Sequence, residues 1–324
     1  MKPRAFFISL LLIALGAIGA VACLNLYMDT YGVLRADFDM QFTEPNRNFV
    51  SIEHLLAHSD DYDSLLFGSS VVNYIDVRHM PEGRWYNMTT AEGVPAEFLE
   101  DLRLLIGSGM KLSRVQVGLD DFSYQIDPVH HRSQLLNRQH YLIIGQWAPR
   151  YFLDYYLRMP TKNEIKEYRK KRAERTWRFD ITVGQSRTDG ADEAVERDPA
   201  THRADPVFLK PRHYRGDRMD AALEEIRQII ELCRANHIEV RFFINPIHHT
   251  TYADTDKAML DEFKGRLSRI TPYIDFSGPN WISDDNFYWW ETSHFRPVVG
   301  DMIINSLSGI GGGMPGARAV GKPD

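Results

Sequence analysis

Cysteine is nearly absent from this sequence, which contains only Cys23 and Cys233. The first lies in an apolar N-terminal run and the second in a predicted helix, so we do not expect them to meet in the folded chain. A disulfide-bonded scaffold and a cysteine-ligated metal site are therefore excluded. The fold must be held by its own hydrophobic core, for which 324 residues are enough.

An excess of positive charge is also lacking, because 38 Lys and Arg residues stand against 44 Asp and Glu residues, for a net charge of −6. Such a chain has no general attraction for nucleic acid. The histidine pairs His130–His131 and His248–His249 are not joined by a third ligand type at a fixed spacing. We therefore predict no metal site, no cofactor and no nucleic-acid partner.

A long uncharged run from Ala5 to Leu24 is present at the N-terminus and, as a helix, spans about 30 Å, the thickness of one hydrocarbon core. Lys2 and Arg4 precede it and acidic residues follow, which places the N-terminus in the cytoplasm and the rest outside. We predict a signal anchor over residues 1–24 and a juxtamembrane segment over 25–60. A cleaved signal peptide is the alternative, although its apolar region is usually only ~7–15 residues long.

From residue 61 onward, short apolar runs alternate with segments of helical periodicity, a pattern typical of a parallel sheet with helices on both faces. One helix is predicted to begin at Pro95, and another covers Asp220–Ala235. The predicted strands are Ser64–Phe67, Trp85–Met88, Arg114–Leu119, Val240–Asn245 and Tyr273–Phe276. We therefore expect an α/β domain over residues 61–308.

The alternation is interrupted between about residues 130 and 218. This insertion contains a predicted helix over Gln134–Leu157, a basic run over Lys162–Arg178 and a polar stretch over Thr182–Pro206. The basic run is typical of a solvated helix face, or it meets an anionic polymer or lipid headgroup. Residues 309–324 are rich in glycine and are predicted to form a flexible tail.

Two motifs contain residues suited to catalysis. Gly68-Ser69-Ser70 follows the first strand, at the sheet edge where ligands bind in open α/β folds, so Ser70 is a candidate nucleophile. Glu291 precedes His294 by three residues, a spacing that allows the acid to orient the imidazole as a base. Taken alone, the serine motif is more typical of an ordinary turn, and the Glu291–His294 motif is equally compatible with a helix cap beside a buried histidine.

The two motifs lie near the two ends of the alternating domain. Together with the alternation between them, they resemble the SGNH hydrolase superfamily. The most similar branch is the membrane-anchored, extracytoplasmic one associated with O-acetylation of polysaccharides and D-alanylation of teichoic acids. The resemblance implies a flavodoxin-like three-layer α/β/α fold with a parallel sheet. It also implies that Ser70 is the nucleophile and His294 the base, with Glu291 in place of the usual aspartate.

The resemblance further implies that the backbone N–H groups of Ser70 and Gly93 form an oxyanion hole. The family's Gly-x-Asn-Asp block is replaced by Gly118-Leu-Asp-Asp121, and an ionised Asp120 in that place would repel an oxyanion. Asn73 and Asn87 are candidate replacement donors.

The remaining predicted neighbours of the site follow strand ends or flank the two motifs. For the pair His248–His249 we expect exposure to solvent, which is usual for histidines in a loop. The aromatic residues beside His294 are expected to pack in the core or to present their faces to sugar rings. These neighbours are Ser69, Asp121, His248 and Trp290.

The function expected from the resemblance is serine-dependent transfer of an acyl group, in particular acetyl, to or from a cell-surface or exported polysaccharide. The protein is then expected in the inner membrane of a bacterium with its domain outside, where a membrane O-acyltransferase is a possible partner. One alternative is a catalytically impaired subunit that binds glycan or scaffolds that acyltransferase, which Asp120 and Glu291 motivate. Another is an extracytoplasmic esterase.

Overall fold

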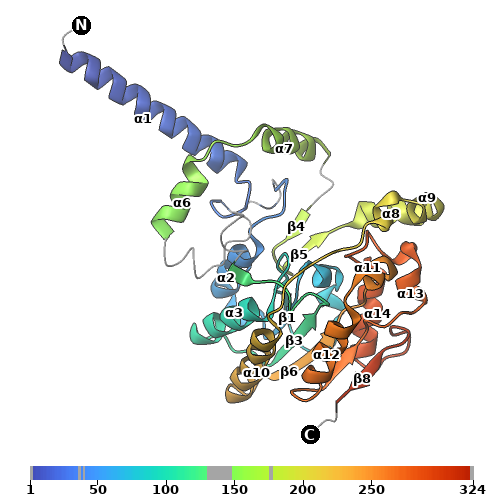
Figure 1. The fold of residues 1–324 in the computed structure, drawn as a ribbon. Coiled ribbons are helices and arrows are strands. Elements are labelled where there is room, and N and C mark those ends of the chain that lie inside the picture. The colour runs from blue at the N-terminus through green and yellow to red at the C-terminus, as the bar shows by residue number, and fades with distance from the viewer. Residues whose placement is uncertain (1–2, 36–37, 39–40, 130–147, 175–177, 322–324) are drawn as a thin grey trace.

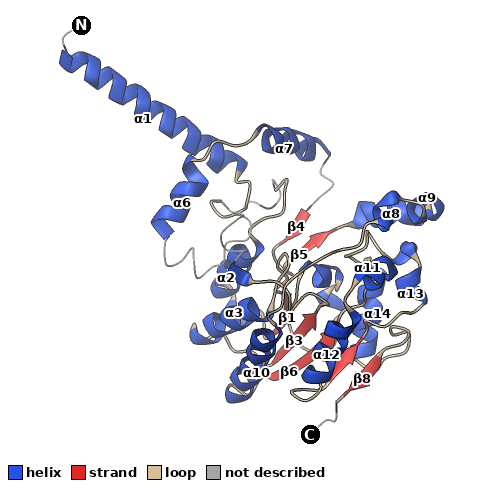
Figure 2. Cartoon of the chain, in the orientation of Figure 1, coloured by secondary structure: helices blue, strands red, loops and turns tan. Residues whose placement is uncertain are grey.

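A computed structural model describes residues 3–35, 38, 41–129, 148–174 and 178–321. Its centre is a six-stranded sheet in the order β2-β1-β3-β6-β7-β8 (Figure 2). The first five strands in this order are parallel, and β8 is antiparallel to β7. The strand bounds are Ser64–Phe67 (β1), Trp85–Asn87 (β2), Arg114–Leu119 (β3), Glu239–Ile244 (β6), Tyr273–Asp275 (β7) and Arg318–Val320 (β8).

Helices cover both faces of this sheet, so the predicted α/β class with a mostly parallel sheet is confirmed (Figure 1). One face packs against the helices α2 (Arg47–Ala57), α3 (Pro95–Gly107), α10 (Met219–Ala235) and α12 (Lys257–Leu267). The other packs against the 3-10 helix η3 (Ser70–Tyr74) and the helices α13 (Trp281–Asp284) and α14 (Pro297–Leu307).

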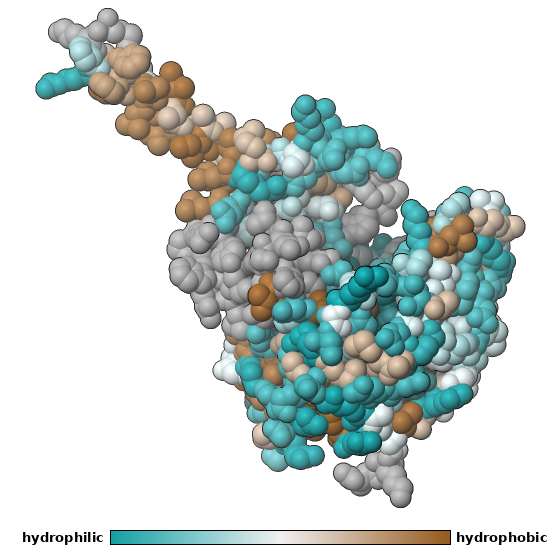
Figure 3. Space-filling view, in the orientation of Figure 1, coloured by the Kyte–Doolittle hydropathy of each residue, from teal (hydrophilic) through white to brown (hydrophobic). Residues whose placement is uncertain are grey.

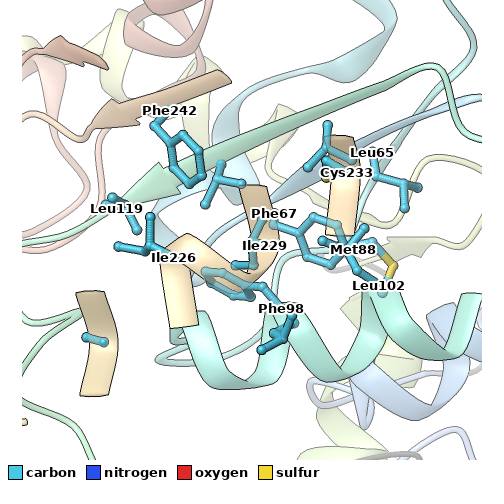
Figure 4. Packing of buried hydrophobic residues seen from close by; sticks show 14 of the residues in the cluster. Leu65, Phe67, Met88, Phe98, Leu102, Leu119, Ile226, Ile229, Cys233 and Phe242 are labelled. Atoms are coloured by element: carbon cyan, nitrogen blue, oxygen red, sulfur yellow. The ribbon is translucent and has the colours of Figure 1, made fainter. Parts of the chain in front are cut away.

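Alternation along the strands explains why both faces are apolar. Leu65 and Phe67 of β1 point into the α3 and α10 layer, whereas Leu66 between them points into the α14 layer. Figure 4 shows the first of these layers, in which Phe67 lies among Phe98 of α3 and Ile229 of α10. A sheet buried on both faces requires strands that are apolar throughout, which is how β1 reads.

The strands and helices form close to their predicted bounds, with differences of one residue at several ends. The C-terminal segment differs from the prediction, since residues 318–320 of the expected flexible tail pair with β7 as β8. A three-residue edge strand after a glycine-rich turn has too little periodicity to be recognised in sequence.

The insertion forms several short elements. The helices are α6 (Ala148–Leu157), α7 (Lys162–Glu174), α8 (Asp189–Arg197) and α9 (Pro199–Arg203), and the strands β4 (Arg178–Asp180) and β5 (Gln185–Arg187) make an antiparallel pair. The first part of the predicted helix Gln134–Leu157 lies outside the described residues, as do His130 and His131. The other short elements are η2 (Ser59–Asp61), η4 (Val77–His79), η6 (Pro206–Leu209), α11 (His249–Asp254) and η7 (Asn286–Tyr288).

The N-terminal helix α1 (Pro3–Met28) projects away from the sheet (Figure 1). It is long and apolar enough to cross a membrane by length and composition, and its most apolar stretch is not buried in the protein. A single apolar N-terminal helix compatible with a membrane anchor is thus present, as predicted.

A substitution at Gly300 tests how tightly α14 packs on η3. A Cβ at this position would lie 2.2 Å from the Tyr74 carbonyl oxygen, whereas a Cβ at Gly265 in α12 would meet nothing within 4 Å. We expect Gly300→Ala to lower the free energy of unfolding by about 1–3 kcal/mol through overpacking. Gly265→Ala, its matched control, should raise it by up to about 1 kcal/mol. Equal effects of the two substitutions in urea denaturation would contradict this packing.

Candidate active site

Ser70 lies at the carboxyl end of β1, the strand that pairs with both β2 and β3. The order β2-β1-β3 reverses direction here, and such switch points are where ligands bind in open α/β sheets. The chain leaves β1 through Gly68 and enters η3 with Ser69 as its N-cap, whose hydroxyl accepts a hydrogen bond from Val71 N at 3.2 Å. Ser69 is fully buried, so it shapes the turn that presents Ser70.

His294 reaches Ser70 from the loop before α14, and the distance from Ser70 Oγ to His294 Nε2 is 2.7 Å. On its other side, His294 Nδ1 is hydrogen-bonded to Glu291 Oε1. The loop is fixed by its own backbone, in which Trp290 N donates to His294 O at 2.8 Å. The structure therefore brings Ser70, His294 and Glu291 into one continuous chain of hydrogen bonds.

Glu291 is held in the ionised form that this arrangement requires. Burial acts to raise its pKa, but hydrogen bonds from His294 and from Ser293 N, the latter at 2.8 Å, bring the pKa below the usual value. A carboxylate there keeps the proton of the neutral imidazole on Nδ1 and leaves Nε2 as the acceptor for Ser70. The glutamate side chain is long enough to reach Nδ1 of His294 from three positions earlier in the chain.

Ser70 and His294 open onto a cavity of about 390 Å³. Its walls also include Arg47 of α2, Tyr74 of η3 and Arg212 of the insertion. Burial raises the pKa of Tyr74 to about 12, so its phenol remains a hydrogen-bond donor. The cavity is of the size that accepts small organic groups.

Asn73 is held with its side-chain amide in one orientation. Its Oδ1 accepts hydrogen bonds from Arg47 Nη1 at 2.7 Å and from Ser186 N at 3.0 Å. Both neighbours are donors, which identifies the atom between them as the amide oxygen, and the NH₂ end of the amide interacts with Tyr74, which lines the same cavity. Asn73 is 3% exposed, and this orientation is fixed by packing as well as by hydrogen bonds.

Asn87 and Gly93 do not present donors to the cavity. Asn87 Nδ2 donates to Val72 O at 3.0 Å and its Oδ1 accepts from Thr89 N at 2.9 Å, which uses both ends of the amide. The Gly93 N–H donates to Thr90 O at 3.2 Å, and Ala91 and Glu92 line the cavity instead. A Cβ at Gly93 would lie 2.9 Å from Gly68 O, so this glycine allows two turns to approach closely.

Asp120 is buried behind the turn that presents Ser70 and does not line the cavity, contrary to its expected place in the oxyanion region. Its Oδ1 accepts a hydrogen bond from Asn245 Nδ2 at 3.0 Å, and the residue is 2% exposed. Burial raises the pKa of Asp120 to about 6, against the opposing effects of Arg212 and Ser69. Asp121 is ion-paired with Arg212 and lines a second cavity of about 280 Å³.

His248 is a structural residue. The expected solvent exposure is wrong, since the side chain is fully buried and stacks on Phe208 with 5.6 Å between ring centroids. Its Nδ1 accepts from Thr250 N at 3.2 Å as the N-cap of α11, and Nε2 is hydrogen-bonded to Asn286 Oδ1 at 2.9 Å. Burial lowers the pKa of His248 to about 4, so the ring is neutral.

Trp290 packs beside the site without lining the cavity. Its ring centroid lies 6.3 Å from that of Tyr74, and the Arg296 guanidinium lies 5.8 Å from the Trp290 ring. This is the packing role that an aromatic residue has by default. Among the described residues, no group of three or more His, Cys, Asp or Glu side chains could hold a metal ion.

Comparison of the sequence with known protein families finds no family that matches, and no similar sequence is found among curated proteins. Inferences about function therefore depend on the geometry around Ser70.

Sequence reasoning missed several residues of the cavity wall, namely Arg47, Tyr74, Ser186, Arg212 and Tyr214. Arg47 and Ser186 are 139 positions apart, yet Arg47 Nη2 donates to Ser186 Oγ at 2.6 Å. No local pattern links positions so distant. Arg212 follows a stretch read only as charged and polar, and its burial over the Phe122 ring, at 4.4 Å, is visible only in three dimensions.

Asp120→Asn should reveal the raised pKa of this buried carboxyl. The folded protein keeps the proton up to about pH 6, whereas the unfolded chain releases it near pH 4, so wild-type stability falls as the pH rises through this interval. We expect the stability of Asp120→Asn relative to wild type to increase by up to about 3 kcal/mol between pH 4 and pH 7.

Urea denaturation of both proteins in detergent at the two pH values measures this difference. The lowered pKa of His248 acts in the opposite direction over the same interval, but it is present in both proteins and cancels. A difference that stays constant with pH would show that the pKa of Asp120 is not raised in the folded protein.

Proposed function

We propose that the protein is a serine-dependent acyl-transfer enzyme. The observation that carries this proposal is the continuous hydrogen-bond chain from Ser70 through His294 to Glu291, opening onto a cavity. A hydroxyl bonded to a base that a third group orients is the usual signature of an activated nucleophile.

In this mechanism, Ser70 Oγ attacks the carbonyl carbon of an ester while His294 Nε2 takes its proton. The tetrahedral intermediate collapses as the ester C–O bond breaks, and His294 returns the proton to the departing alcohol. A second hydroxyl, from a sugar or from water, then attacks the acyl-serine, with His294 again taking and returning the proton. Glu291 stabilises the imidazolium in both steps.

The oxyanion is stabilised in this proposal by Ser70 N–H and Asn73 Nδ2. Ser70 is the first residue of η3, so its N–H has no carbonyl partner within that helix. Arg47 and Ser186 hold the oxygen of the Asn73 amide, which leaves its NH₂ to interact with Tyr74 of the same cavity. Asn73 thus supplies the oxyanion donor that was expected from the Gly93 N–H. It also replaces the asparagine of the family's Gly-x-Asn-Asp block, which this chain lacks in Gly118-Leu-Asp-Asp121.

The proposed family is the SGNH hydrolase superfamily. The parallel strands lie in the order β2-β1-β3-β6-β7, the doubly wound order of flavodoxin-like folds, with Ser70 after the first strand and His294 before the last long helix. This arrangement agrees with the resemblance, which alone supplies acetyl as the acyl group and an exported polysaccharide as the substrate.

We place the domain outside the cytoplasmic membrane of a bacterium, with a membrane O-acyltransferase as a possible partner. Lys2 and Arg4 before α1 favour a cytoplasmic N-terminus. Two contacts favour the enzyme over the alternative of an impaired scaffold: Glu291 is hydrogen-bonded to His294, and Asp120 does not line the cavity. An esterase remains the other alternative, distinguished by whether water or a sugar accepts the acyl group.

Ser70→Ala and Glu291→Gln test the nucleophile and its orienting group. We expect detergent-solubilised wild type to react with a fluorophosphonate probe and to hydrolyse p-nitrophenyl acetate. Ser70→Ala should abolish both reactions, and Glu291→Gln should lower turnover by about 10³- to 10⁴-fold, because an amide favours the wrong imidazole tautomer. Turnover that survives Ser70→Ala would overturn the mechanism, and a wild type inert to probe and ester would favour the scaffold.

Asn73→Asp tests the proposed oxyanion donor with little change in shape. The aspartate still accepts from Arg47 and Ser186 but cannot donate, so kcat should fall about 100- to 1000-fold with the melting temperature nearly unchanged. Thr188→Ala, on the wall of the same cavity, is the matched control and should lower kcat only slightly. An Asn73→Asp variant with the kcat of wild type would show that the donor lies elsewhere.

A further inference from the structure

The surface around the end of α1 carries features that the Ser70 site does not use. The apolar side chains of α1 are exposed along its length, and Leu24 and Leu26, near its C-terminal end, are 38% and 40% exposed. Figure 3 shows this apolar surface as a continuous shaft that ends against the rest of the protein. If α1 crosses a bilayer, whatever packs against its C-terminal end lies at the membrane surface.

Helix α6 packs against that end of α1. Asn25, buried near the last turn of α1, donates from Nδ2 to the carbonyl oxygens of Tyr156 and Arg158, each at 2.6 Å. These carbonyls belong to the C-terminal end of α6, so one α1 side chain satisfies groups that a helix end otherwise leaves unpaired. The contact fixes α6 at the level where α1 leaves its apolar stretch.

The described side chains of α6 and of the turn after it expose apolar surface beside one acidic residue, Asp154. Leu153, Leu157 and the following Met159 are 55%, 42% and 68% exposed. Leu153 and Leu157 are four positions apart and therefore share one helix face. Exposed apolar side chains beside a membrane-spanning helix fit the boundary between headgroups and acyl chains, where interfacial helices bury their apolar face.

Helix α7 is joined to the same region by its inner face. The Tyr168 ring contacts the rings of Tyr27 and Phe42, with centroid separations of 5.9 and 5.2 Å. Glu164 forms an ion pair of 2.8 Å with Arg158, just after α6. These contacts attach α7 to the chain segment that emerges from α1.

The outer face of α7 is basic. Lys162, Lys166, Arg169 and Lys170 are all exposed and follow the spacing i, i+4, i+7 and i+8, which places them in one stripe. Of the acidic residues between them, Glu164 is paired with Arg158, and the half-buried Glu167 leaves the stripe with an excess of positive charge. The surface over α7 is hydrophilic beside the apolar shaft of α1 (Figure 3).

We propose that α6 and α7 dock the protein onto the surface of the bilayer that α1 enters. The apolar face of α6 inserts at the headgroup boundary, and the basic stripe of α7 binds anionic lipid headgroups. The net charge of −6 disfavours a general attraction to anionic lipid, so the interaction depends on this local stripe. The proposal is independent of the chemistry at Ser70.

Site-specific fluorescence in nanodiscs tests the α6 contact. In full-length protein carrying Cys23→Ser and Cys233→Ala, a single cysteine at Leu153 or Leu157 is labelled with an environment-sensitive dye. The discs contain lipids with a quencher near the headgroup. We expect quenching at least about twofold stronger than for a label at Leu209, the matched control, an exposed leucine of η6 at 77% exposure. Equal quenching at the α6 and η6 positions would overturn the proposal.

Charge reversal tests the α7 contact in the same discs. Lys166→Glu with Arg169→Glu should reduce quenching of the Leu157 label by about half in discs with anionic lipid and leave it unchanged in zwitterionic discs. Arg227→Glu with Arg234→Glu, on the exposed side of α10, is the matched control and should have no effect. A double α7 variant that behaves like this control in anionic discs, with an unchanged melting temperature, would overturn the lipid role of α7.

Discussion

The hydrogen bond between Ser70 and His294 joins the two ends of the α/β unit, and the candidate site exists only where both ends are held in place. One end is the turn after β1, fixed by buried Ser69 and by Gly300 of α14 packed against Tyr74. The other is the loop before α14. A shift of about 1 Å at either end would break a bond of 2.7 Å, so the geometry of the candidate site depends on the packing of α14 on η3.

Buried cations connect the site to segments outside the core sheet. Arg47 of the juxtamembrane helix α2 holds Asn73 and contacts Ser186 of the β4–β5 hairpin. Arg296, fully buried after His294, donates to Asp192 and Glu196 of α8 at 2.7 Å each. Because a buried charge is costly without a partner, these contacts constrain the juxtamembrane segment and the insertion to fold around the site. The insertion is therefore a wall of the cavity and not a separate appendage.

The sequence predicted the parts of this structure that follow from local pattern. Strand β1, its terminal serines and the Glu291-to-His294 spacing are all short-range features, and they sufficed to bring Ser70 and His294 forward as a pair. The expectations that differed from the structure concern the positions and directions of individual side chains. Whether Asp120 or Asn73 faces the cavity depends on the partners Asn245 and Arg47, which are distant in sequence, and the burial of His248 depends on Phe208 and Trp289. Pattern identifies candidate residues, but tertiary contacts decide which way their side chains point.

The separation of Ser70 from His294 by 224 positions has a consequence for biogenesis. Helix α1 precedes both residues in the sequence, so it is translated before either of them. A nascent chain can hold Ser70, its turn and most of the sheet, yet this hydrogen bond cannot form until residue 294 has been translated and α14 has packed on η3. Contacts between such distant positions are also slow to form. The hydrogen bond between Ser70 and His294 therefore forms late in folding, after all five parallel strands of the sheet have been translated.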